Sequence, residues 1–291
     1  MIVAALVFTI AAPPPSRTAD TSLIVSTAWL AQHAADRAVV LIQVDANDSA
    51  YRAGHIPGAR FLPYQAIIAE VNGLSTELPP VDSLRAHLEA LDVSNSSHVV
   101  LTGSPLTVAR AFFTLDYLGL RNVSVLDGGV AKWRAEGRRV EEGVGTKAVA
   151  RGHLVVTAHP EIVATSDWIA ARVASGGAGL ALVDTRHEDE YLGRNPASTG
   201  HIAGARRLEW EEMFTSTTEF ALKDRATIEQ MWRSLAAPGD TVVAYCRVGH
   251  RSSATYFVAR LLGYPVKLYD GSYQDWSARG MALVKTATGP R

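Results

Sequence analysis

The segment Thr241-Val-Val-Ala-Tyr-Cys-Arg-Val-Gly-His-Arg251 joins a short apolar run to a polar loop, and a helical pattern follows it. Val242 and Val243 are apolar and β-branched, which is typical of a buried strand in a parallel sheet. The next apolar residues recur at helical spacing, and they are Ala254, Phe257, Val258, Leu261 and Leu262. Gly263 is predicted to end this helix, because glycine readily takes the left-handed conformation found just past a helix end. The segment therefore predicts a strand, a loop and a helix of an α/β fold.

The loop after this strand runs from Cys246 to Arg251, and its inner positions are Val248, Gly249 and His250. A loop closed so tightly between a strand and a helix is predicted to turn consecutive backbone N–H groups inward, as a nest that binds anions. We therefore expect the loop to surround the cysteine sulfur and to bind an anion beside it.

Cys246 is the single cysteine of the chain, and its neighbours indicate a reactive thiol. A lone cysteine is usually a small buried hydrophobic residue. Here Arg247 and Arg251 accompany it, and a helix capped by Ser252 or Ser253 adds the positive end of its dipole. This electropositive setting favours the thiolate, which is the nucleophilic form of cysteine. Cys246 is therefore the predicted catalytic nucleophile.

The loop Cys246-Arg-Val-Gly-His-Arg251 resembles the active-site loop of the rhodanese family of sulfurtransferases, which commonly reads Cys-Arg-x-Gly-x-Arg or Thr. The related Cdc25-type phosphatases and arsenate reductases have a loop one residue longer, which fits a tetrahedral oxyanion. In this chain the arginine comes after four intervening residues, and Ser252 follows it. The resemblance implies a sulfurtransferase in which Cys246 carries the transferred sulfur as a persulfide.

Four sequence features occur twice, in the same order, along the chain. They are Trp29 with Trp168, Asp45 with Asp184, His55-Ile-Pro-Gly-Ala59 with His201-Ile-Ala-Gly-Ala205, and Asp127-Gly-Gly-Val-Ala-Lys-Trp133 with Asp270-Gly-Ser-Tyr-Gln-Asp-Trp276. The first two pairs share a spacing of 139 residues. Such an ordered series indicates an internal duplication.

Each copy alternates short apolar runs with helical patterns. In the first copy, strands are predicted near Val39–Val44, Val99–Thr102 and Val123–Leu126, and a helix is predicted from Val108 to Leu118. This alternation indicates an α/β fold with a parallel sheet and helices on both faces. With the resemblance, it predicts two tandem rhodanese-like domains, each a parallel sheet flanked by helices. The predicted divisions are a tail at 1–21, a first domain at 22–141, a polar, glycine-rich linker at 142–156 and a catalytic domain at 157–291.

The two copies differ where the chemistry is expected. The strand Val99–Thr102 is followed by Gly103-Ser-Pro-Leu-Thr107, which contains no cysteine, and the next arginine, Arg110, lies inside the predicted helix. Only the second loop can therefore hold a nucleophile. The resemblance implies that the first domain is an inactive copy that covers one side of an active-site cleft at the domain interface.

Arg186 follows the predicted strand Leu180–Asp184, so we expect it at the carboxyl edge of the sheet, beside Cys246. The resemblance implies that the arginine of an Asp-x-Arg motif contacts the anionic substrate, and that Asp184 holds the loop that presents it. The alternative for Arg186 is a surface ion pair with Glu188 or Glu190.

The predicted anion-binding set is completed by Arg247 and Arg251. His250 is expected to supply backbone and positive field, because sulfur transfer needs no acid or base when both leaving groups depart as anions. Val248 differs from some thiosulfate-using members of the family, which have lysine at this place. Mercaptopyruvate-using relatives typically begin this loop Cys-Gly-Ser-Gly, so Arg247 favours thiosulfate as the donor.

Several recurring aromatic and histidine residues are predicted to be structural. His55 and His201 occur in both copies, including the copy without a cysteine, so each is expected to bond the backbone of a turn and not to bind a metal. The recurring tryptophans are predicted to be core residues, and they are Trp29, Trp133, Trp168 and Trp276.

The composition is that of a globular protein: 291 residues, 47% apolar and 20% charged, long enough for two domains. The net charge of −1 argues against a general binder of nucleic acid or anionic membranes. One cysteine excludes internal disulfides and a cysteine-based zinc site. The apolar segment Met1–Ala12 is typical of a signal peptide and is too short to span a bilayer. Export to the periplasm or outside the cell is expected if it is a signal, and a cytoplasmic location otherwise.

The predicted reaction moves the sulfane sulfur of thiosulfate to cyanide or a thiol through a persulfide on Cys246. No metal or organic cofactor is predicted, and the predicted partners are a small anionic sulfur donor and the acceptor, bound by a monomer. Three alternatives stay open: a 3-mercaptopyruvate sulfurtransferase, a non-catalytic sulfur carrier or binding module, and a Cdc25-type phosphatase or arsenate reductase.

Overall fold

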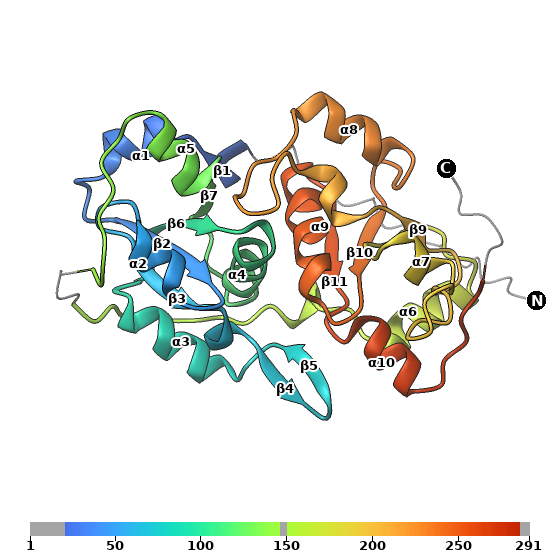
Figure 1. The fold of residues 1–291 in the computed structure, drawn as a ribbon. Coiled ribbons are helices and arrows are strands. Elements are labelled where there is room, and N and C mark those ends of the chain that lie inside the picture. The colour runs from blue at the N-terminus through green and yellow to red at the C-terminus, as the bar shows by residue number, and fades with distance from the viewer. Residues whose placement is uncertain (1–20, 146–149, 286–291) are drawn as a thin grey trace, which may run out of the picture.

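The computed structural model describes residues 21–145 and 150–285, and it shows two α/β domains side by side (Figure 1). The parallel sheets and their flanking helices confirm the predicted fold class. The predicted signal segment Met1–Ala12 lies outside the described residues. None of the helices in the described ranges combines the length and the apolar character that crossing a membrane requires.

The first domain is built on a five-stranded parallel sheet in the order β1-β7-β6-β2-β3. The strands are β1 (Ile24–Val25), β2 (Val39–Asp45), β3 (Arg60–Pro63), β6 (His98–Gly103) and β7 (Val123–Leu126). One face is covered by α1 (Thr27–His33), α2 (Ser49–Ala53) and α5 (Gly129–Ala135), and the other by α3 (Val81–Ala90) and α4 (Pro105–Tyr117). The three predicted strands are confirmed, but α4 begins three residues before the predicted Val108, because Ser104 caps it and Pro105 fits its first turn.

The second domain repeats this plan with a four-stranded parallel sheet in the order β11-β10-β8-β9. The strands are β8 (Leu180–Asp184), β9 (Arg206–Arg207), β10 (Thr241–Tyr245) and β11 (Val266–Leu268). One face is covered by α6 (Ser166–Ala174), α7 (Glu188–Tyr191) and α10 (Ser272–Ala278), and the other by α8 (Arg225–Arg233) and α9 (His250–Leu261). Successive residues of β8 and β10 point to opposite faces of the sheet, and those on each face belong to a buried hydrophobic cluster. Both faces of the sheet are therefore apolar and buried, as the valine-rich runs predict.

The two domains share one hydrophobic core, because α4 and α9 pack against each other between the two sheets (Figure 1). Phe112 of α4 meets Phe257 of α9 edge to face, with ring centroids 4.8 Å apart. Phe113 meets Tyr256 in the same way at 5.1 Å. Such aromatic contacts add to the free energy of burying the rings. The interface is therefore apolar at its centre, and this holds the domains in a fixed relation.

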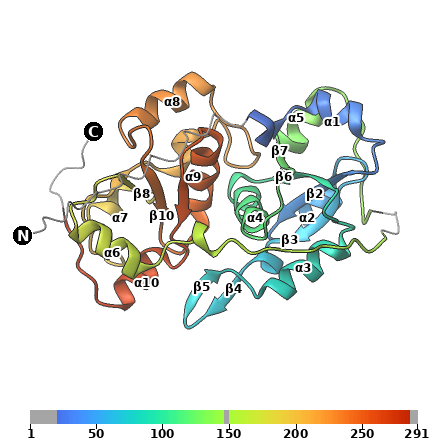
Figure 2. The same ribbon diagram turned by 180° about the vertical axis from the view of Figure 1, so that it is seen from behind.

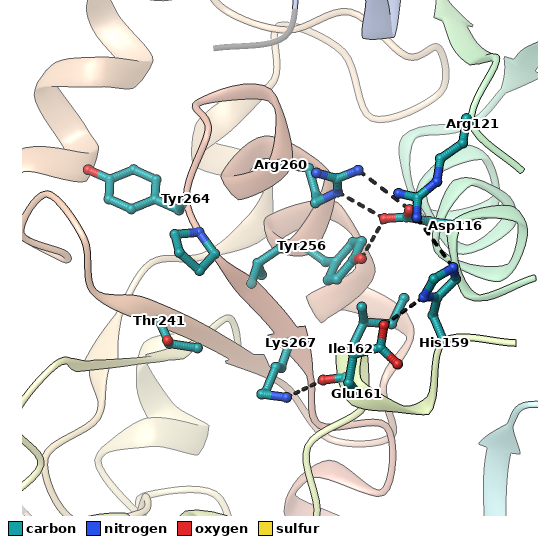
Figure 3. Close-up of a pocket in the computed structure, with 12 residues that line it drawn as sticks. Asp116, Arg121, His159, Glu161, Ile162, Thr241, Tyr256, Arg260, Tyr264 and Lys267 are labelled. Carbon is teal, nitrogen blue, oxygen red and sulfur yellow. Dashed lines mark hydrogen bonds and ion pairs between the residues drawn. The ribbon is translucent and has the colours of Figure 1, made fainter. Parts of the chain in front are cut away.

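A polar cluster closes one end of this helix pair (Figure 3). Asp116 of α4 accepts hydrogen bonds from Tyr256 Oη at 2.7 Å and from Arg260 Nε at 2.9 Å. A cavity of about 360 Å³ lies beside the cluster and reaches the start of β10. Cys246 follows the other end of β10, so this cavity is not the predicted active site.

Each domain extends an arm to the other (Figures 1 and 2). The hairpin of β4 (Ala69–Val71) and β5 (Leu74–Glu77) reaches α10, where Gln274 Nε2 donates to Gly73 O at 2.9 Å. Residues 214–222 of the second domain reach back, and Phe220 N donates to Gly103 O at 3.1 Å. Beside it, a Glu219 carboxylate oxygen accepts the N–H of Ala131 at 3.2 Å. Gly103, at the end of β6, and α10 are thus each contacted from across the interface.

Short 3₁₀ helices complete the fold, namely η1 (Thr21–Leu23), η2 (Tyr64–Ile67), η3 (Pro160–Ile162) and η4 (Trp210–Met213). The connection between the domains runs along the first domain: Gly152 N donates to Glu89 O at 2.8 Å, and Val155 N donates to Asn95 Oδ1 at 2.8 Å. Gly143 N donates to Arg52 O at 2.8 Å, so both ends of the predicted linker contact the first domain.

The recurring histidines have the structural role predicted for them. Nδ1 of His55 lies 2.9 Å from Tyr51 O, and Nδ1 of His201 lies 2.9 Å from Tyr191 O. The prediction for the tryptophans is only half right. Trp133 and Trp276 are buried, whereas Trp29 and Trp168 are half-buried and pack against the edges of the cores of their domains. Trp29 there stacks on His33, and Arg172 lies over the ring of Trp168.

Candidate active site

The reactive loop lies between the end of β10 and the start of α9, as predicted, but the helix begins earlier. Gly249 is the residue before α9, with φ 83°, and His250 is the first helical residue. Ser252 and Ser253 are therefore inside the helix and do not cap it. Their hydroxyls donate back to Gly249 O at 3.1 and 2.9 Å. The prediction of a serine cap was wrong, because the left-handed glycine lets the helix begin sooner.

Gly249 is needed at this position for two reasons. Its φ of 83° is in the left-handed region, where side chains are strained. A Cβ atom there would also lie 2.3 Å from Oδ1 of Asp270, which is closer than van der Waals contact allows. At the other end of the helix, Gly263 has φ 84° and follows the last helical turn, which confirms the predicted helix stop.

Cys246 is completely buried, with 0% of its surface exposed. Its Sγ lies 3.6 Å from Ser252 Oγ, whose single proton can be donated either to the sulfur or to Gly249 O. Its backbone N–H donates to Ser272 Oγ at 3.1 Å. The N–H groups of Arg247, Val248 and Gly249 donate to no acceptor within the described part of the chain. These three donors remain available for an anion, which is what the nest prediction requires.

Ser272 is a site residue that sequence reasoning missed. It has φ 51°, an unfavourable left-handed backbone for serine, and the equivalent position in the first copy is Gly129 with φ 55°. The second copy therefore keeps the strained conformation with a residue that has a hydroxyl. That hydroxyl donates to Tyr269 O at 2.7 Å and accepts the Cys246 N–H. The change from glycine to serine between the two Asp-Gly motifs was the signal that could have found it.

The three arginines predicted to bind the anion have different surroundings. Arg247 is exposed and has no carboxylate partner among the described residues. Arg251 makes two hydrogen bonds to the carboxylate of Glu190, at 2.7 and 3.0 Å. Burial acts to raise the pKa of Glu190, but the bond and charge of Arg251 outweigh it, so the pKa is lowered and Glu190 stays ionised. The structure thus brings Arg247 and Arg251 to the loop of Cys246, the latter already paired.

Arg186 is fully buried, at 0% exposure. Its Nε donates to Asp184 at 2.9 Å, and its Nη2 donates to Asp184 at 2.6 Å and to Gly200 O at 2.8 Å. The guanidinium also lies 4.4 Å from the ring centroid of Tyr273. The alternative of a surface ion pair with Glu188 or Glu190 is therefore wrong. Direct contact of Arg186 with a substrate stays a prediction, and it would require these bonds to open.

His250 does not supply the positive field expected of it. Burial, together with the charges of Arg110 and Arg251, lowers its pKa to about 4, so the imidazole is neutral near pH 7. Its ring contacts Tyr64 of the first domain, with centroids 4.7 Å apart. The reactive loop therefore faces the domain interface, as the resemblance implies.

Arg110 is a second residue whose importance the sequence did not reveal. It is fully buried in α4 and forms an ion pair with both carboxylate oxygens of Asp270, which follows β11 in the other domain. Because Asp270 also packs against Gly249, this ion pair ties the first domain to the reactive loop. For a metal, the described residues offer one group of candidate ligands, namely His187 and Glu211, which are exposed, and Glu209, which is half-buried.

Comparison with known proteins shows which protein family this chain matches and which characterised proteins it resembles. The Rhodanese-like domain family matches it twice, at residues 26–136 and 165–279. The chain is 34% identical over 250 residues to a thiosulfate sulfurtransferase of Pseudomonas aeruginosa, covering 81% of this chain and 88% of that protein. It is 32% identical over 276 residues to the sulfur carrier protein TtuD of Thermus thermophilus, covering 89% of this chain and 94% of that protein. The crystal structure of SseA from Escherichia coli, a 3-mercaptopyruvate sulfotransferase, has the same fold, with a TM-score of 0.73 at 24% identity over 87% of this chain and 99% of that one.

Proposed function

The chain belongs to the Rhodanese-like domain family as a tandem-domain sulfurtransferase, and from this premise we propose that it transfers the sulfane sulfur of thiosulfate through Cys246. One observation carries the proposal. The single cysteine of the chain stands at the carboxyl end of β10, in a loop whose N–H groups find no acceptor among the described residues and, with the nearby arginines, suit an anion.

In the first step of the proposed reaction, the Cys246 thiolate attacks the outer sulfur of thiosulfate. A new S–S bond forms, the S–S bond of thiosulfate breaks, and sulfite leaves with the bonding electron pair. In the second step, cyanide or a thiolate attacks the outer sulfur of the persulfide, and Cys246 leaves as the thiolate again. Both leaving groups depart as anions, so neither step needs a proton transfer. The result is covalent, ping-pong catalysis.

The arginines have distinct parts in this proposal. Arg247 binds the incoming dianion, because it is exposed and has no carboxylate partner within the described residues. Arg251 acts through its charge, which reaches Cys246 even though the guanidinium is bonded to Glu190. Arg186 is held by Asp184, and it binds the donor only if that pair opens.

Thiosulfate is favoured over 3-mercaptopyruvate by the charge at the loop. Thiosulfate is a dianion, and it gains from the field of Arg247 and Arg251 at both of its ends. Mercaptopyruvate carries a single carboxylate and needs polar contacts to orient its carbonyl group.

A phosphatase is disfavoured because the loop has four residues between Cys246 and Arg251, one fewer than the phosphate cradle needs.

Intact mass measurement tests the proposal. Wild-type protein incubated with thiosulfate, then desalted, should gain the mass of one sulfur atom, and cyanide should remove it as thiocyanate. Cys246→Ser should fold normally and gain nothing, because a hydroxyl is too weak an acid to replace a thiolate. A wild-type protein that gains no sulfur from thiosulfate but gains it from 3-mercaptopyruvate would refute the choice of donor.

A sulfur carrier is the second candidate, because a relative with 32% identity bears that name. A carrier would hold the persulfide and release it only to a protein partner. Multiple turnovers with cyanide or a small thiol favour the enzyme, whereas a stable persulfide that small acceptors do not discharge favours the carrier.

A further inference from the structure

Two polar atoms beside the reactive loop are buried without a hydrogen-bond partner among the described residues. They are Tyr64 Oη, from η2 of the first domain, and His250 Nε2, from the loop itself. Tyr64 is 6% exposed, and its ring contacts that of His250 across the domain interface. The two unpaired groups therefore lie together, where the domain without a nucleophile meets the loop with one.

An unpaired buried hydroxyl is unfavourable, because it has lost its bonds to water and gained none in return. Other buried tyrosines of this fold satisfy theirs: Tyr51 Oη donates to Ala59 O at 2.8 Å, and Tyr256 Oη donates to Asp116 at 2.7 Å. A phenylalanine at position 64 would fill the same space without this cost. The hydroxyl of Tyr64 is thus better explained by a ligand than by the fold.

The electrostatic setting identifies the kind of ligand. Burial raises the pKa of Tyr64, so its phenol is a neutral hydrogen-bond donor at any physiological pH, and the charges that act on it are those of Arg110, Asp270 and Cys246. Arg110 and Asp270 are already paired with each other, and the one buried atom of this pair without a partner in the described residues, Arg110 Nε, is a donor and cannot accept the phenol proton. The remaining partner is the anion that reacts at Cys246.

We propose that Tyr64 is a substrate-contacting residue, whose hydroxyl donates a hydrogen bond to a sulfonate oxygen of thiosulfate while the outer sulfur lies against Cys246 Sγ. The inference rests on the function proposed above and gives the first domain a direct part in choosing the donor. As the S–S bond of thiosulfate breaks, its electron pair passes to the departing sulfite, and the charge on the sulfonate oxygens increases. A hydrogen bond from Tyr64 therefore strengthens in the transition state. The neutral ring of His250 forms the adjacent wall and adds no competing charge.

The test compares Tyr64→Phe with Tyr256→Phe. The first variant removes the unpaired hydroxyl, and the second is a matched control that removes a bonded hydroxyl from the same interface, at the Asp116 cluster. Single-turnover persulfide formation is measured with two sulfur donors, thiosulfate and glutathione persulfide. The second donor has no sulfonate oxygen next to its outer sulfur, so it cannot accept the proposed bond.

Tyr64→Phe should lower the second-order rate with thiosulfate by about ten- to a hundredfold, the effect of losing one hydrogen bond to a charged group. Its rate with glutathione persulfide should change by less than about twofold, and its urea unfolding midpoint should be unchanged or higher. Tyr256→Phe should retain both rates and lose stability.

Three results would overturn the role of Tyr64: a thiosulfate rate within about twofold of wild type, an equal loss with both donors, or a lower unfolding midpoint. The last would mean that the hydroxyl has a structural partner after all. If wild type itself forms no persulfide from thiosulfate, the proposed function fails instead, so the two failures are distinct.

Discussion

The buried ion pair between Arg110 and Asp270 should be the most sensitive polar contact of the domain interface. Both side chains are almost fully buried, at 0% and 2% exposure, and they come from different domains. Arg110 Nη2 also donates to Thr76 O at 2.6 Å, in the hairpin of β4 and β5. Arg110→Met keeps the length of the side chain but removes its charge. It leaves the Asp270 carboxylate buried without a cation.

Removing one partner of a buried ion pair typically costs about 3–5 kcal/mol, because the other charge is left unpaired in a medium that solvates it poorly. A domain of ordinary stability unfolds at a cost of about 5–15 kcal/mol, so this loss is a large share of the total. The double variant Arg110→Met with Asp270→Leu removes both charges, and we expect it to recover most of the loss, since apolar replacements of a buried pair are often close to neutral.

Urea unfolding, followed by tryptophan fluorescence, measures these differences. Arg52→Met is the control, because the pair of Arg52 with Asp48 is exposed, at 52% and 41%, and its removal should cost no more than about 0.5 kcal/mol. The reasoning is refuted if Arg110→Met costs less than about 1 kcal/mol, or if the double variant is as unstable as the sum of its two single variants.

Four further predictions follow from the site and the interface. Ser272→Gly keeps the left-handed backbone but removes the acceptor of the Cys246 N–H, so single-turnover persulfide formation should slow by about two- to tenfold without loss of stability; an unchanged rate would show that this bond does not position the sulfur. Burial raises the pKa of Glu219 from 4.5 to about 7, so its pKa in the folded protein lies above its pKa in the unfolded chain. The stability that Glu219 contributes is therefore complete below pH 4.5 and is lost as the pH rises through 7. Glu219→Gln should therefore match wild type in urea unfolding at pH 4.5 and be more stable at pH 8, by on the order of 1 kcal/mol after allowance for partial exposure; equal stability at both pH values would contradict the buried carboxylate. Gly103 has φ 136°, and a Cβ atom there would lie 2.5 Å from Val44 O. Gly103→Ala should therefore cost at least about 1–3 kcal/mol of stability, while the rate of persulfide formation per folded molecule is retained. A selective loss of that rate would give the loop of the first domain a chemical role. Val248→Lys adds a cation to the loop and should lower the KM for thiosulfate, with a raised or unchanged KM counting against a dianion site there.

Local patterns in the sequence determined the fold class, and they also predicted a nucleophile. Alternating apolar runs and helical patterns are short-range signals, and the repeated motifs place them in two equivalent units, so two parallel sheets could be predicted without any long-range information. Cys246 could be proposed as that nucleophile because the loop expected to activate it is contiguous with it in the sequence. The same reasoning identified His55 and His201 as structural, because the copy without a cysteine has one as well.

The partners of the charged groups were decided only by the tertiary structure. The sequence shows that Arg186 and Arg251 lie near the reactive loop, but a guanidinium pairs with whichever carboxylate the packing brings to it. For Arg251 that carboxylate is Glu190, 61 residues away, and for Arg110 it is Asp270, 160 residues away. A local sequence pattern cannot predict pairs that are so far apart in the sequence.

The contact that the first domain makes with His250 could likewise not be predicted from the sequence of that domain. Tyr64 belongs to a short 3₁₀ helix without any chemical motif, and it reaches His250 only because α4 and α9 pack against each other and fix the two domains. The neutral state of His250 has the same origin, since burial at that interface lowers its pKa. The sequence by itself thus predicted which atom reacts, and the packing of the two domains decided what surrounds that atom, because burial and charge pairing depend on contacts between residues far apart in the chain.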